Sequence, residues 1–146
     1  MKVVPDENGN LPARIVFTQD DNGNLFEITD FYCKVYAGIS GVASPKIQIT
    51  ANKYMLTSNL NLGFADNLRN WYFRFTSFGE KNGGLFSAPN NTNSSGFPNS
   101  NIGNGINLAT PITSELDGIS QIAINVFTGG GKWIENSEFQ LYGVRK

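Results

Sequence analysis

The segment FYCKVY, residues 31 to 36, decides the fold of this chain. Phenylalanine, cysteine and valine occupy its odd positions, and tyrosine, lysine and tyrosine occupy its even positions. Side chains on a β-strand point to opposite faces in turn, so this alternation predicts a strand with one face in an apolar core.

The same period of two recurs along most of the chain, in residues 14–18, 46–51, 71–76, 121–126 and 139–144. No segment has a convincing period of 3.6, and the best helical candidate, residues 58–70, has room for one short helix at most. The pattern predicts an all-β chain, folded as a two-sheet antiparallel β-sandwich of jelly-roll-like order. We expect the last strand to lie centrally in a sheet, with Phe139 and Leu141 in the core.

The length of 146 residues indicates one domain, residues 1–146. The strand pattern stops in an Asn-, Gly- and Ser-rich stretch at about residues 81–105. Two interpretations of this predicted loop stay open. It is either a linker between strands or an apical loop whose amide groups bind a polar ligand.

The sequence Asn-Gly-Asn-Leu occurs in residues 6–17 and again in residues 20–31, at a spacing of 14. Because Asn-Gly tolerates positive φ angles, each copy predicts a tight two-residue hairpin turn that leads into a strand. A calcium loop beginning at Asp20 is disfavoured, since Leu25 stands where that loop needs glycine and Phe31 where it needs glutamate.

Charge and composition limit the partners. The chain has 11 basic and 12 acidic residues without a cluster of either sign, which disfavours nucleic acid. No apolar stretch approaches the ~18 residues of a membrane span, and the amino end lacks the apolar core of a signal peptide. We therefore expect that the protein does not insert into a membrane and that it is made in the cytoplasm. The single cysteine, Cys33, is expected to be a small buried apolar residue.

Catalysis is disfavoured because the chain has no histidine, which excludes Ser-His-Asp and Cys-His arrangements and the usual zinc sites. A pair of carboxylates, as in a glycosidase, remains an alternative. The candidate pairs are Glu135 with Glu138 and Glu115 with Asp117. We predict a protein that is not an enzyme and has no cofactor and no metal.

The segment GGGKWIENS, residues 129 to 137, is the candidate ligand-binding loop. Trp133 would offer a flat apolar face to a sugar ring, with hydrogen bonds from Lys132, Glu135 and Asn136. In the alternative, Trp133 folds back as a lid on the core. Trp71 shares its parity with core residues of its own strand and is expected inside.

Four tyrosines have outward parity on their predicted strands: Tyr32, Tyr36, Tyr72 and Tyr142. Together they predict an exposed aromatic patch, which serves a neighbouring subunit as readily as a ligand. We expect an interface at this patch.

Both ends of the chain resemble a known family. The segments are FTQDDNGNLFEITDFYCKVY and ISQIAINVFTGGGKWIENSEFQLYGVRK, and the second holds the more specific positions: Ile122, Ile124, Gly129 to Gly131, Trp133, Ser137, Phe139, Leu141, Tyr142 and Gly143. These segments are similar to the β-sandwich domains of fibre, receptor-binding and capsid-decoration proteins of tailed bacteriophages. The middle of the chain has no such likeness.

The resemblance implies a non-enzymatic component of the virion, often a homotrimer attached to other virion proteins of a tail or head. Weak, multivalent contact with host-surface carbohydrate is the function that we expect from it. The alternative is a purely structural capsid or tail decoration protein that binds no glycan.

Overall fold

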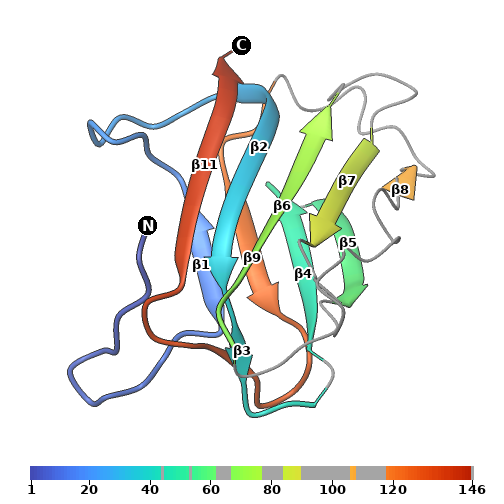
Figure 1. Ribbon diagram of the computed structural model, residues 1–146. Coiled ribbons are helices and arrows are strands. Elements are labelled where there is room, and N and C mark those ends of the chain that lie inside the picture. The colour runs from blue at the N-terminus through green and yellow to red at the C-terminus, as the bar shows by residue number, and fades with distance from the viewer. Residues whose placement is uncertain are drawn as a thin grey trace.

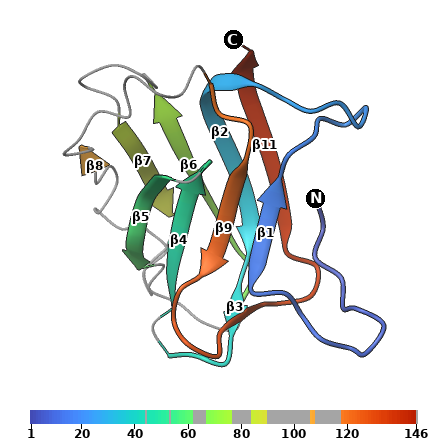
Figure 2. The same cartoon turned by 180° about the vertical axis from the view of Figure 1, so that it is seen from behind.

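The computed structural model describes residues 1–43, 45–52, 54–61, 67–76, 84–89, 106–107 and 118–145. All regular secondary structure in these residues is β-strand, arranged in antiparallel sheets. Two larger sheets lie face to face as layers (Figures 1 and 2). The prediction of an all-β chain with the architecture of an antiparallel β-sandwich is therefore confirmed.

The larger sheet has the order β11-β2-β6-β7-β8. Its strands are β11 (Glu138–Arg145), β2 (Ile28–Ala37), β6 (Arg69–Thr76), β7 (Gly84–Pro89) and β8 (Ile106–Asn107). The opposing sheet has the order β1-β9-β4-β5. Its strands are β1 (Arg14–Phe17), β9 (Ile122–Val126), β4 (Lys46–Ala51) and β5 (Tyr54–Asn61). A short ribbon pairs β3 (Ile39–Ser40) with β10 (Lys132–Trp133).

The core lies between the two sheets and follows the predicted parity. On β2 the residues with odd numbers from 31 to 37 are buried, and on β4 those from 47 to 51. Phe31 packs between two rings of β6, stacked on Phe75 at 5.6 Å between centroids and edge-on to Phe73 at 6.0 Å. The sheet pairing brings these rings together, because Phe31 lies directly opposite Phe75 in the β2–β6 register.

Strands that are distant in sequence pair with each other. β9 lies between β1 and β4, so a late strand separates two early ones. β11, however, lies at the edge of its sheet, next to β2, and the expectation of a central position was wrong. An edge strand still contributes its inner face, and Phe139 is fully buried while Leu141 is half-buried.

Two short hairpins near the amino end repeat one geometry. The backbone N–H of Gly9 donates to the carbonyl of Asp6, and that of Gly23 to Asp20, each at 2.9 Å. In each hairpin the glycine has a positive φ and the preceding asparagine does not. Tight reversals were predicted correctly, but the connection is a type I turn followed by a left-handed glycine instead of a two-residue turn.

The aspartate of each hairpin explains this choice of turn. The carboxylates of Asp6 and Asp20 accept backbone N–H groups from the residues two and four positions later, at 2.8–2.9 Å. These donors, above all the one four positions later, hold the pKa of both carboxyl groups below the usual value. The side chain thus fixes the backbone of the turn from inside.

One expectation about an irregular segment needs correction. The predicted loop at residues 81–105 contains strand β7, which pairs with β6 along its whole length. Its other residues lie outside those described. Here the pairing with a neighbouring strand outweighs the local composition. Of residues 58–70, which have room for one short turn or helix at most, 58–61 belong to β5 and 69–70 to β6, and 62–66 lie outside the described residues.

Cys33 lies in the middle of β2, opposite Phe73 on one side and Leu141 on the other, and is fully buried. Burial raises the pKa of its thiol far above the usual range, which leaves almost no thiolate near neutral pH. The expectation of a buried apolar cysteine is confirmed.

We therefore predict that maleimide labels Cys33 of the folded protein at pH 7 at least about tenfold more slowly than in 6 M guanidinium, because the thiol reacts only after local opening. Mass spectrometry over a time course measures both rates. Equal rates in the two conditions would show that β2 is not in the core.

Candidate functional site: an exposed tyrosine face

Trp133, the centre of the predicted ligand-binding loop, is fully buried. It lies on β10 opposite Ile39 of β3, and its backbone N–H donates to the carbonyl of Pro12 at 2.9 Å. Its indole packs edge-on against Phe139 at 4.9 Å between centroids and stacks on Trp71 at 6.4 Å. The ring fills the end of the core between the sheets, so it presents no face to a sugar.

Two glycines let the chain approach closely enough for this burial. A Cβ on Gly131 would lie 2.6 Å from a methyl group of Val126, and a Cβ on Gly38 would overlap the backbone carbonyl of Asn67. Within the glycine-rich loop, close packing thus explains Gly131 and the positive φ of 82° explains Gly130, while nothing lies within 4 Å of a Cβ added to Gly129.

Lys132, Glu135 and Asn136 are exposed on the turn around the buried indole. Lys132 alternates with Trp133 on β10 and therefore points to the opposite side. Asn136 has a φ of 66°, and its backbone N–H donates to the carbonyl of Val3 at 3.1 Å. Both features stabilise the backbone at this turn. The sugar site predicted on Trp133 is corrected, because its aromatic platform is part of the core.

The four tyrosines, in contrast, lie together on the outer face of the larger sheet. Tyr142 on β11 lies directly opposite Tyr32 on β2, with ring centroids 6.2 Å apart. Tyr72 on β6 contacts the other side of Tyr32 at 5.5 Å. Tyr36 is also exposed on this face but makes no ring contact with the other three in the described part of the chain. We call the row Tyr142–Tyr32–Tyr72 the tyrosine face.

Polar side chains surround the tyrosine face. Lys34 lies between Gln140 and Tyr72 in the register, and Arg74 lies beside Tyr32. All three polar residues are exposed. These three residues share the parity of the tyrosines on the same strands, and this parity was the signal in the sequence that could have placed them in the patch.

Two hollows mark the ends of this surface. One, of about 370 Å³, is mostly apolar and is lined by Tyr32, Arg74, Tyr142 and Val144 among others. The other, of about 230 Å³, is lined by Lys34, Tyr36, Asn70, Glu138 and Gln140. The surface therefore offers aromatic rings, an apolar hollow and hydrogen-bonding groups side by side.

The described residues contain no cluster of three or more acidic or cysteine side chains that would hold a metal ion. Of the carboxylate pairs considered for catalysis, Glu135 and Glu138 are both exposed. Glu115 and Asp117 lie outside the described residues. Across the ranges that the structure covers, no helix has the length and hydropathy needed to cross a membrane.

Comparison with known proteins finds no matching family model, no similar curated protein and no similar solved structure.

The burial of Trp133 predicts an effect on stability. Trp133→Ala should lower the free energy of unfolding by about 3–5 kcal/mol, because it leaves a cavity between Trp71 and Phe139. Lys132→Ala, its exposed neighbour, should change it by less than ~0.5 kcal/mol. Urea denaturation followed by tryptophan fluorescence and circular dichroism compares the two variants. Similar small losses would contradict the buried position of the indole.

Proposed function

We propose that this protein is a non-enzymatic attachment module that binds glycans weakly through the tyrosine face. The observation that carries the proposal is the row of contacting rings across three adjacent strands, in which Tyr72 and Tyr142 are exposed and Tyr32 between them is half-buried. Aromatic rings stack on the apolar faces of sugars, and Lys34, Gln140 and Arg74 supply hydrogen bonds beside them.

The energetics favour a site made of several rings. Covering ~100 Å² of one ring contributes about 2.5 kcal/mol before any cost of binding, at ~25 cal/mol per Å². Millimolar affinity requires roughly 4 kcal/mol net. Two adjacent rings contribute about 5 kcal/mol before the cost of binding, so a single site stays weaker than about millimolar affinity.

Weak sites of this kind are useful when several copies act together, since a high effective concentration multiplies affinity by ~10² or more. The resemblance to sandwich domains of tailed-bacteriophage virion proteins supports a location on a virion, where a homotrimer or many copies face the host surface. We therefore also propose that the protein is located on a virion and contacts other virion proteins.

A purely structural role is the second candidate, and the apolar hollow beside Tyr32 and Tyr142 favours it. In that case the tyrosine face is covered by another copy of the chain or by another virion protein. This role needs no glycan, and the covered tyrosine face would then be the interface expected from the sequence.

Glycan binding is tested with the protein displayed in many copies on beads against a glycan array. Tyr142→Ala should reduce the bound signal about ten- to hundredfold, because it removes the most exposed ring of the row. Phe127→Ala is the matched control, since Phe127 is similarly exposed but follows β9 of the opposing sheet. An array without any signal, or an equal loss in both variants, would contradict the proposal.

The oligomeric state separates the two candidates. If the face is free for glycans, any oligomer that forms at micromolar concentration should persist in Tyr142→Arg. If the face is an interface, this substitution should dissociate the oligomer, because it places a second arginine near Arg74. Multi-angle light scattering measures the mass of both proteins, and dissociation in Tyr142→Arg supports the structural role.

A further inference from the structure

The outer edge of β11 is only partly paired. The segment Met1–Val3 runs antiparallel to its beginning, with a bridge between Lys2 and Glu138. The N–H of Phe139 donates to the carbonyl of Met1 at 2.8 Å, and the amino group of Met1 donates to the carbonyl of Phe139 at 2.7 Å. The first residues of the chain therefore form one extra strand on this edge, which reaches as far as Phe139.

Among the described residues, no segment pairs with the part of this edge that follows Phe139. The backbone groups of a strand point alternately to its two sides, so those of Leu141 and Gly143 point the same way as those of Phe139, away from β2. Within the described residues, the structure records no hydrogen bond to these groups on that side. Two N–H donors and two carbonyl acceptors are thus left free in register with the pairs that Met1 makes.

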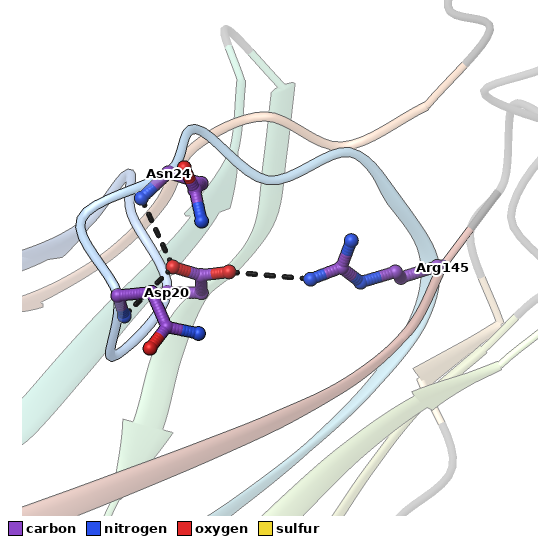
Figure 3. Close-up of polar contacts among 4 residues, drawn as sticks. Asp20, Asn24 and Arg145 are labelled. Atoms are coloured by element: carbon purple, nitrogen blue, oxygen red, sulfur yellow. Dashed lines mark hydrogen bonds and ion pairs between the residues drawn. The ribbon is translucent and has the colours of Figure 1, made fainter.

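The space beside this edge is a cleft of about 430 Å³. β11 forms one wall, and the segment from Phe17 to Ile28, which contains the Asp20 hairpin, forms the other. Arg145 at the end of β11 reaches the carboxylate of Asp20 at 3.2 Å (Figure 3). This ion pair joins the two walls at one end of the cleft, and Met1 lies at the other.

We propose that this cleft binds an extended segment of another polypeptide, which adds an antiparallel strand to β11 in line with Met1–Val3. Main-chain hydrogen bonds to Leu141 and Gly143 would hold it, as in other cases of strand addition at a sheet edge. The pairing of Met1 with Phe139 shows the geometry of such a strand on the same edge.

The register sets the side-chain pattern of this segment. Residues of the bound strand opposite Leu141 and Gly143 face inward, on the side of Phe17, Phe26 and Ile28, and should be apolar. On the inner side of Gly143 lies the side chain of Ile28, because a Cβ added to Gly143 would lie 2.7 Å from a methyl group of Ile28. An apolar residue opposite Gly143 would therefore pack against Ile28. Residues opposite Gln140 and Tyr142 face solvent and should be polar.

The two walls decide between a single strand and a second copy of the chain. A whole sheet edge of another copy would meet the Asp20 hairpin, which stands beside β11 along the cleft. A single extended segment would need only the space between the two walls. The inference uses backbone groups at the edge of the sheet, so it does not depend on the proposed function of the tyrosine face.

The test uses the full ¹⁵N-labelled chain and a capped five-residue peptide, matched to residues 140–144, in which two valines alternate with lysine and threonine. Hydrogen exchange followed by NMR should show at least about tenfold slower exchange of the Leu141 and Gly143 amides at saturating peptide. The control peptide carries N-methyl groups on its valines, which removes the donors that face β11, and should give no protection.

The variant Leu141→Pro removes one open N–H and should weaken protection of Gly143; proline is tolerated on an edge where the N–H faces outward. If this variant does not fold, the comparison of the two peptides on the unmodified chain still tests the proposal. Unchanged exchange at millimolar peptide, or equal protection by both peptides, would overturn the proposal. Protection without peptide that disappears on dilution would overturn it as well, by showing a second copy on the edge.

Discussion

The pairing of β2 with β6 and β11 is the constraint on which the rest of the structure depends. Phe31, Cys33 and Val35 of β2 form the centre of the core, and the register to β6 and β11 brings Phe73, Phe75, Phe139 and Leu141 around them. The same register fixes the opposite face. Because successive side chains alternate, burying one set of residues places Tyr32 between Tyr72 and Tyr142 on the outside. Core and candidate site are two consequences of one alignment of strands.

The core and the outward tyrosines were predictable because parity is a local property. Trp133 was not, although both of its possible positions were considered. Its burial depends on the pairing of β10 with β3, which joins residues almost a hundred positions apart. This close approach is possible because Gly38 and Gly131 have no Cβ. β7 was missed for a related reason: the composition of the Asn- and Ser-rich stretch around it is that of a loop, and its strand state depends on the open side of β6. Contacts distant in sequence decide both cases.

The turns show where local chemistry is sufficient and where detail is lost. Asn-Gly indicated a reversal at both copies of the repeat, and both reversals are present. The type of turn depends on the aspartate that precedes it, since its carboxylate accepts two N–H groups and so favours a type I turn. In the second copy the corresponding aspartate, Asp20, also forms an ion pair with Arg145. Asp20 thus links a local turn to the far end of the chain, and this link has no signal in the sequence.

The edge position of β11 carries a physical problem, because free N–H and C=O groups at a sheet edge invite pairing with other chains. Proteins usually cover or distort such edges. Here the amino-terminal residues cover the beginning and the register shift between Val144 and Arg145 interrupts the end. Within the described part of the chain, Leu141 and Gly143 remain unpaired between them. The Asp20 hairpin stands beside this remaining stretch and limits access to a single extended chain. With an end covered by Met1–Val3, an end interrupted at Val144 and a wall on one side, this edge is better suited to one strand of matching pattern than to the edge of a second sheet, which is the basis of our proposal.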